Sequence, residues 1–171
     1  MVSCSDEWLE TLPKDLIIEE NFWQSEKQLK EAVAGCYAAV LNDEGDDNDG
    51  NGAVRQMILW GEIRADNVVP SGNAKEEETK MTTCNIIPSN KFCQWKFFYT
   101  AINNCNNVLE NADLVRENDN TVTEAEIKAY KAEALALRSM LYFYLVRTYK
   151  EVPLILTASK TNEQDFNVVK S

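Results

Sequence analysis

The 171-residue chain contains no histidine, and two other features common in enzymes, metalloproteins or membrane proteins are missing as well. Histidine is the commonest general base and the commonest metal ligand, so its absence argues against acid–base catalysis and most metal sites. The five cysteines form no C-x-x-C pair, which excludes a zinc knuckle and a thioredoxin-like motif. No apolar run reaches the roughly 18 residues of a membrane-spanning helix. We therefore expect a protein that is not an enzyme and holds no cofactor or metal.

Basic residues are also scarce, with 17 lysines and arginines against 28 acidic residues and a net charge of −11. Phosphate contacts need clustered Lys and Arg, so nucleic acid is excluded as a partner, and docking onto anionic lipid is disfavoured. A neutral ligand such as a sugar is unaffected by the sign of the charge. The 44% of hydrophobic residues is typical of a globular protein, and the length fits one domain.

Apolar residues spaced three and four apart predict four helices. Ser25 with Gln28, and Thr123 with Glu126, have the spacing of helix-capping boxes. The ten residues between the third helix and the Thr123 cap of the fourth suit an antiparallel hairpin, the unit of tetratricopeptide-like repeats. The predicted fold is therefore all-α, built from tetratricopeptide-like antiparallel helix hairpins with long irregular loops. The predicted helices cover residues 26–41, 53–60, 91–112 and 124–149.

Two segments between these helices are predicted to be loops. Residues 43–52 are acidic and resemble a calcium loop only in part. With Gly50 at the central glycine, the first and twelfth ligand positions hold Gly45 and Gln56, where a calcium loop needs carboxylates. An exposed acidic turn is the favoured interpretation, with a calcium site as the alternative. The irregular stretch 68–90 is long enough that it is expected to be either functional or disordered.

The cysteines fall into three groups. Cys36 and Cys105 lie within helical patterns and are predicted to be buried thiols. Cys84 and Cys93 lie in loop sequence, and whether they pair is left open. Cys4 follows an aliphatic and a small residue and resembles the end of a bacterial lipobox, in which the cysteine is acylated. The other interpretation of Cys4 is a chance cysteine near the terminus.

Several residues of the third and fourth predicted helices have more than one possible role. Trp95 shares an apolar stripe with Phe98 and Ile102 and is predicted to lie in the core. Arg138, on the fourth helix, is predicted to pair with a neighbouring acid or another helix. Four asparagines are unusual inside a helix, and we expect them to bond backbone or a facing helix, with ligand binding as the alternative. They are Asn103, Asn104, Asn106 and Asn107.

Four segments in order match the pattern of one known family: 22–37, 62–67, 95–106 and 133–154. The last is the most specific, with an Ala/Arg-rich helix, Tyr-Phe-Tyr-Leu-Val-Arg, a further Tyr, and Val-Pro-Leu. Together the segments resemble the SusD-like (RagB/SusD) family of nutrient-binding outer-membrane lipoproteins. One departure is Lys150, which stands where the family usually has glycine, so a left-handed glycine cap is not available.

The resemblance implies binding without chemistry. It implies a lipoprotein on the cell surface, anchored in the outer membrane through Cys4, that captures an oligo- or polysaccharide for a TonB-dependent (SusC-like) transporter. Because family members are longer, the chain corresponds to their N-terminal part. The expected organisation is an extended arm with the lipobox-like cysteine over 1–24, a helical domain over 25–156, and a polar tail over 157–171 that continues into a C-terminal part.

Sugar recognition requires an aromatic face for the apolar side of the ring and planar polar groups for its hydroxyls. Trp60, Arg64, Asp66 and Asn67 meet this requirement, at a helix end that borders the long irregular stretch. They are the predicted ligand-binding residues. The alternative is that the arginine and aspartate form an ion pair that only fixes the loop.

Two other classes of function remain open from the residues alone. A helical-repeat scaffold that binds protein would show a concave face of exposed side chains and no lipid on Cys4. A hydrolase would need two carboxylates roughly 5–10 Å apart in a cleft, and no such pair stands out in the sequence.

Overall fold

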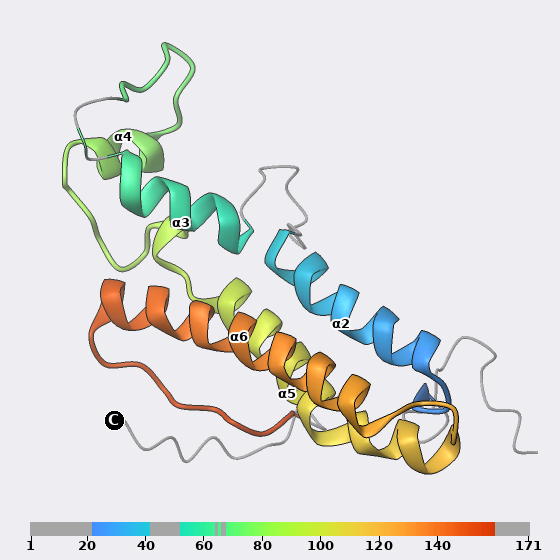
Figure 1. The fold of residues 1–171 in the computed structure, drawn as a ribbon. Coiled ribbons are helices and arrows are strands. Elements are labelled where there is room, and N and C mark those ends of the chain that lie inside the picture. Colours follow the sequence, from blue (N-terminus) through green and yellow to red (C-terminus); the bar gives the residue numbers. More distant parts are fainter. Residues whose placement is uncertain (1–21, 42–51, 64, 66–67, 160–171) are drawn as a thin grey trace, which may run out of the picture.

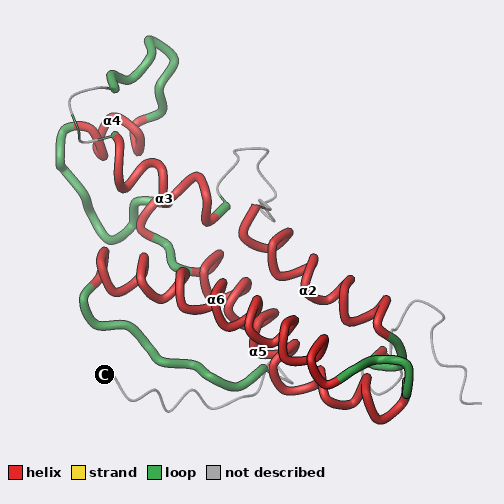
Figure 2. Tube along the Cα trace, in the orientation of Figure 1, coloured by secondary structure: helices red, strands yellow, loops and turns green. Residues whose placement is uncertain are grey.

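Every regular element is helical in the computed structural model, which describes residues 22–41, 52–63, 65 and 68–159 (Figure 2). The predicted all-α class is confirmed. In chain order the elements are α2 (Glu26–Leu41), α3 (Ala53–Glu62), α4 (Glu76–Thr82), the 3₁₀ turn η2 (Lys91–Cys93), α5 (Lys96–Asn118) and α6 (Glu124–Tyr149).

The first and last predicted helices are confirmed at both ends. At the start of α6 the Thr123 hydroxyl accepts a 3.3 Å hydrogen bond from the N–H of Glu126. The Glu126 carboxylate in turn accepts a 2.8 Å bond from the N–H of Thr123. This is the predicted capping box, and it satisfies two backbone donors that the helix itself leaves unpaired.

The helix predicted over 91–112 is wrong at both ends. Its first residues form η2, where the Asn90 side chain accepts a 2.9 Å hydrogen bond from the N–H of Phe92. Extended backbone at Gln94 then separates η2 from α5, which continues to Asn118. The apolar spacing runs through this break, so periodicity alone does not reveal it.

Helix α4 lies inside the stretch 68–90 that was predicted to be irregular. Its first turn is acidic, which suits the positive end of the helix dipole, and the Glu78 carboxylate accepts a 3.1 Å bond from the N–H of Lys75. Met81 is its one buried side chain. Seven residues with one buried position give too short an apolar pattern to be recognised as a helix.

Helices α5 and α6 form an antiparallel hairpin joined by residues 119–123, and α2 packs along both (Figure 1). The hairpin predicted from the sequence is therefore confirmed. Helices α3 and α4 lie beyond one end of this layer. Each fully buried leucine at the interface contributes roughly 1.5–3 kcal/mol of stability. The buried face of α6 consists of Ile127, Ala134, Leu137, Leu141 and Leu145.

After α6 the chain turns and runs back along the hairpin as an extended segment, residues 150–159, which we call the return segment (Figure 1). Side chains of both helices bind its backbone. The Tyr99 hydroxyl donates a 2.6 Å hydrogen bond to the carbonyl of Pro153. The Tyr142 hydroxyl donates to the carbonyl of Ile155 at 2.9 Å and accepts from its N–H at 2.7 Å. These bonds satisfy backbone groups of a segment that belongs to no helix.

The helical asparagines mostly bind backbone, as predicted. Asn106 is fully buried, and its amide nitrogen donates to the carbonyls of Ile155 and Thr157 at 3.2 and 3.0 Å. Asn103 accepts a 2.7 Å bond from the N–H of Ser159. Arg138 donates a 2.7 Å bond to Asn106 on the facing helix, which confirms its structural role.

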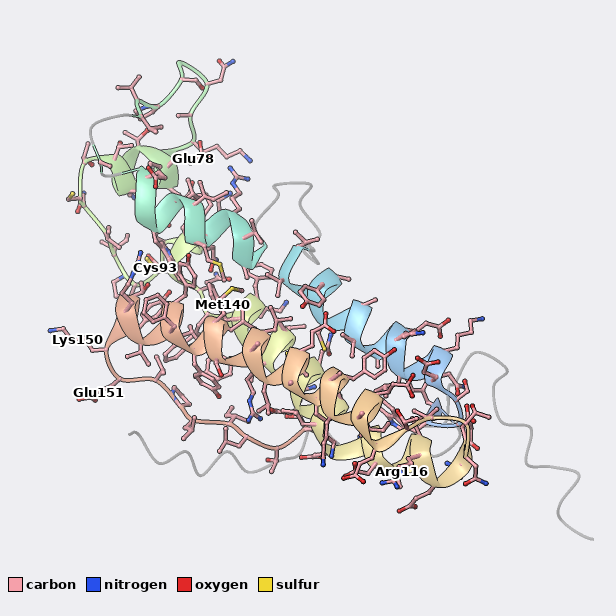
Figure 3. The ribbon with its side chains drawn as sticks, viewed as in Figure 1. Glu78, Cys93, Arg116, Met140, Lys150 and Glu151 are labelled. Atoms are coloured by element: carbon pink, nitrogen blue, oxygen red, sulfur yellow. The ribbon has the colours of Figure 1, made fainter. Side chains whose placement is uncertain are left out.

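The turn that follows α6 is centred on Lys150, which has φ 65° and ψ −67°. Its N–H bonds the carbonyl of Val146, and the N–H of Glu151 bonds the carbonyl of Tyr149 at 2.9 Å. This is the geometry of a γ-turn with positive φ, which is strained for a residue with a side chain. The side chains of Lys150 and Glu151 project outward at this corner (Figure 3).

Candidate ligand-binding site

Trp60, predicted to be a ligand-binding aromatic, belongs to the core. Its side chain is only 8% exposed, and its indole N–H donates a 2.8 Å hydrogen bond to the carbonyl of Phe92. Its ring stacks on Phe98, with 5.1 Å between centroids and 8° between planes. With its N–H and a ring face already engaged, Trp60 is not the open platform that we expected. The structure places it at the inner wall of a cavity.

The other predicted binding residues, Arg64, Asp66 and Asn67, lie outside the described residues, and their role stays a prediction. The same is true of Cys4 and of the acidic segment 43–51. Helix α3 precedes the Arg-x-Asp-Asn segment. Its C-cap residue, Ile63, is buried and anchors this end of the helix.

A cavity of about 410 Å³ lies beside Trp60, which we call the α3–α6 cavity. Its volume falls within the range of small-molecule sites. Cys93 lies between α3 and the end of α6 (Figure 3). The walls are mainly apolar, with a few polar groups at the end of α6. The lining residues are Trp60, Met81, Ile86, Ile87, Pro88, Cys93, Thr148 and Tyr149.

Trp95, predicted to lie in the core, is instead 41% exposed at the N-cap of α5. Its ring contacts Tyr149, which lines the cavity, with centroids 5.5 Å apart, and it meets Tyr99 edge to face at 6.0 Å. The break before α5 rotates Trp95 out of the buried stripe, so the helical spacing assigned it to the wrong face. Trp95 is thus an exposed aromatic next to a residue that lines the cavity.

The residues before α5 are held in place by contacts with α3 and α4. The Asn90 amide donates a 3.1 Å bond to the carbonyl of Glu77. Arg55 forms a 2.7 Å ion pair with Glu78 and lies over the ring of Phe92 at 5.5 Å. Both helices therefore anchor residues 90–92, next to Cys93, which lines the cavity.

Tyr149, which lines the cavity, and Tyr99, which lies near it, both hold backbone through their hydroxyl groups. The Tyr149 hydroxyl donates a 2.8 Å bond to the carbonyl of Cys93, and burial raises the pKa of Tyr149. Burial likewise raises the pKa of Tyr99. Both hydroxyls therefore remain protonated donors at neutral pH, and they hold backbone in place instead of transferring protons.

The cavity offers no acid pair, because none of its described lining residues is an aspartate or glutamate. Within the described chain no group of three or more Cys, Asp or Glu side chains is placed to hold a metal. No helix there has the length and hydropathy to cross a membrane. Cys84 and Cys93, whose pairing was left open, are not joined by a disulfide, and Cys36 and Cys105 are buried as predicted. The arrangement suits binding of a ligand with apolar and hydroxyl surface.

Comparison with known proteins gives one consistent result. A SusD-like family model, described as starch-binding and associating with the outer membrane, matches residues 7–171. The SusD-like protein P38 of Formosa agariphila is 30% identical over 160 residues, which are 92% of this chain and 28% of that protein. A SusD-like protein of Bacteroides ovatus is 26% identical over 153 residues, covering 90% of this chain and 26% of that protein.

A solved structure shows a similar fold. The crystal structure of a SusD superfamily protein from Bacteroides thetaiotaomicron matches with a TM-score of 0.66 and 22% sequence identity. The match covers 84% of this chain and 30% of the solved chain. The chain thus spans little more than a quarter of the length of the sequence relatives that it matches.

Proposed function

The chain belongs to the SusD-like family, which is described as starch-binding and associating with the outer membrane, and we propose that it forms the non-catalytic N-terminal part of a glycan-capture lipoprotein. In this proposal the whole protein is held at the cell surface by a lipid on Cys4. It passes an oligo- or polysaccharide to a TonB-dependent, SusC-like transporter. The family description and the absence of carboxylates from the described cavity lining support binding of a neutral sugar without catalysis.

We further propose that residues 25–156 are the helical domain of a longer protein, with 1–24 as its anchoring arm and 157–171 as the link to its C-terminal part. The relatives support this, since each is more than three times as long as the matched region. The surface of α6 supports it independently.

Helix α6 is apolar on two opposite faces. One face is buried against α5 and α2, while the other exposes Phe143 at 59%, together with Val146 and Leu135. A cavity of about 460 Å³ lies on this outer face, lined by Phe143, Val146 and three neighbours. A contiguous apolar patch exposed on a helix commonly marks a surface that is covered in the complete protein. We propose that a further helix pair of the longer chain covers this face, as in stacked helical repeats.

The observation that carries the sugar-binding proposal is the exposed ring of Trp95 beside the α3–α6 cavity. The Trp95 residue is 41% exposed and offers part of its ring surface to the apolar side of a pyranose, while Tyr99 and Tyr149 pack against the ring. The segment with Arg64, Asp66 and Asn67 follows α3 and is proposed to supply the planar polar groups. The site therefore combines an aromatic surface with hydroxyl-binding side chains.

The binding test measures retention of the full-length protein on immobilised starch, with soluble glucans as competitors. Trp95→Ala is expected to weaken retention about 2- to 12-fold, because one aromatic stacking contact is worth on the order of 0.5–1.5 kcal/mol. Tyr37→Ala removes another exposed aromatic ring, one that does not line the cavity, and should leave retention unchanged. Equal retention of wild type and Trp95→Ala would place the site elsewhere.

The assembly test is affinity purification of the native protein from detergent-solubilised membranes, followed by mass spectrometry. Recovery of a TonB-dependent transporter together with acylated Cys4 supports the capture proposal. A protein without lipid or transporter would contradict it. The helical-repeat scaffold that binds protein would then be the better explanation of the fold.

A further inference from the structure

Two buried cysteines, Cys36 on α2 and Cys105 on α5, have no part in the proposed function. The two residues are 1% and 0% exposed, and both thiols are free in the structure. Neither residue lines the α3–α6 cavity. Two cysteines can form a disulfide bond only where the fold brings their backbones close and directs their side chains toward each other. The packing of α2 on α5 decides whether this condition is met.

Two hydrogen bonds fix how α2 lies against α5. The side chain of Asn118, at the end of α5, donates a 3.0 Å bond to the carbonyl of Trp23, shortly before α2. The side chain of Asn104, within α5, donates a 3.4 Å bond to the carbonyl of Gly35 in α2. Residue numbers thus rise along α2 as they fall along α5, so the two packed helices are antiparallel (Figure 1).

This register places the two cysteines opposite each other. Cys36 lies as many residues beyond Trp23 as Cys105 lies before Asn118. Facing positions of an antiparallel helix pair keep this relation, because both helices rise by the same distance per residue. Cys36 also directly follows Gly35, which the second hydrogen bond holds against α5. Both cysteines belong to the buried stripes of their helices, so their side chains share one packed core.

The two thiols are in hydrogen-bond contact across this interface. That contact lowers the pKa of the Cys105 thiol, burial opposes the change, and the positive charge of Arg138 lowers the pKa further. The same contact, together with burial, raises the pKa of the Cys36 thiol. Cys105 is therefore the thiol that loses its proton first, and the thiolate is the form of cysteine that attacks a disulfide.

We propose that Cys36 and Cys105 form a disulfide bond between α2 and α5 when the protein meets a small oxidising disulfide such as oxidised glutathione. The Cys105 thiolate attacks one sulfur of the oxidant, and the first glutathione leaves as a thiolate. The Cys36 thiol then loses its proton, and its sulfur attacks Cys105 and displaces the second glutathione. Two electrons and two protons pass from the cysteine pair to the oxidant, which is reduced to two glutathione thiols.

The bond joins α2 to α5 and encloses α3, α4 and η2 in a covalent loop. A disulfide stabilises a protein mainly by restricting the unfolded chain, and more so when the loop is long. In the folded protein Cys36 gives up a 3.4 Å thiol hydrogen bond to the carbonyl of Ala32, and a thiol is a weak donor. The oxidised protein is therefore expected to unfold at a higher temperature than the reduced protein.

Burial of the two thiols sets how fast the bond forms. Oxidised glutathione reaches them when α2 opens away from α5, which is a local unfolding step. The reaction is therefore followed to equilibrium, and parallel samples contain urea below the unfolding transition to speed the opening.

The test starts from full-length protein whose thiols have been reduced. After equilibration with oxidised glutathione, the protein is unfolded in urea with iodoacetamide, and peptide mapping by mass spectrometry locates the labelled cysteines. Labelling of Cys36 and Cys105 should fall at least about tenfold relative to the reduced protein, because structural disulfides resist reduction by glutathione. A peptide that links the two residues should appear, and the thermal midpoint should rise.

Three variants serve as controls. Cys36→Ala and Cys105→Ala each remove one half of the pair, and alanine is apolar and favours helix, so both variants should fold. Neither should give the linked peptide, and the oxidant should leave their thermal midpoints unchanged. Cys84→Ser is the matched control, because it removes an exposed thiol that lies outside α2 and α5. It should form the linked peptide as wild type does.

Two results would overturn the proposal. Full labelling of both thiols after equilibration, or glutathione left on Cys105 without a link to Cys36, would show that the two sulfur atoms do not meet. A linked peptide in a protein with a lower thermal midpoint than the reduced form would show that the bond pulls α2 out of its native register on α5. Either outcome leaves starch retention, and with it the proposed function, untouched.

Discussion

Arg138 of α6 donates a 2.7 Å hydrogen bond to the side-chain oxygen of Asn106 on α5, and this pair holds the return segment in place. The amide nitrogen of Asn106 is thereby directed at the carbonyls of Ile155 and Thr157. Arg138 also reaches the carbonyl of Leu156, at 3.5 Å. An extended segment is thus fixed to two helices through one buried amide.

The first prediction concerns this amide. Asn106→Ala should lower the free energy of unfolding by about 2–4 kcal/mol, because it leaves two carbonyls and an arginine donor without their partner. Urea denaturation measures the change. Asn111→Ala is the control, since the Asn111 side chain bonds only a carbonyl of its own helix at Asn107, and its loss should cost under about 1 kcal/mol. Equal losses would mean that the return segment adds no stability.

The second prediction concerns the turn after α6. Lys150→Gly should raise the free energy of unfolding by up to about 1 kcal/mol, because glycine adopts the positive φ of this γ-turn without strain. The gain is limited by the greater entropy of glycine in the unfolded chain. Thermal unfolding gives the measurement. Glu151→Gly, one residue later and without positive φ, should be neutral or destabilising.

The third prediction separates the two tryptophans around the cavity. Trp60→Ala should destabilise the protein by about 3–5 kcal/mol, because the ring is buried and stacked on Phe98. Trp95→Ala should cost about 1 kcal/mol or less, because Trp95 is largely exposed. Urea midpoints of the two variants provide the comparison. A reversed order would show that Trp95 is the core residue after all.

The fourth prediction is a pH dependence at the start of α6. Hydrogen bonds from the backbone and side chain of Thr123 lower the pKa of Glu126 below its ordinary value of 4.5. The folded state therefore favours the charged carboxylate, and its contribution is present above 4.5 and is lost as the pH falls through the lowered pKa. Glu126→Gln removes this titration. The stability difference between wild type and Glu126→Gln should shrink as the pH drops below 4.5, as measured by urea unfolding.

The fifth prediction concerns the thiols. Cys84 is exposed and should react quickly with iodoacetamide, whereas the buried Cys36 and Cys105 should react only after unfolding. A hydrogen bond to Cys105 and burial also raise the pKa of the Cys36 thiol, which further lowers its thiolate fraction. Peptide mapping by mass spectrometry identifies the labelled sites. Rapid labelling of Cys36 in the native protein would contradict the packing of α2 on α5.

The sequence alone determined the helices whose apolar stripes are long and whose ends carry clear caps. The first and last residues of helices α2 and α6 are predicted correctly from the sequence. For α6, the apolar spacing and the capping pair Thr123 and Glu126 indicate the same start. The antiparallel hairpin and the family also follow from the sequence, because they depend on element order and on local motifs.

Only the tertiary structure decided whether a side chain is buried or exposed at positions where a break interrupts a helix. Extended backbone at Gln94 places Trp95 at the surface, while Trp60 is drawn into the core by Phe92 and Phe98. Both are tryptophans within apolar patterns, so periodicity cannot tell them apart. Their roles depend on contacts between residues more than 30 positions apart, such as the 2.8 Å bond from Trp60 to Phe92, which no local pattern encodes.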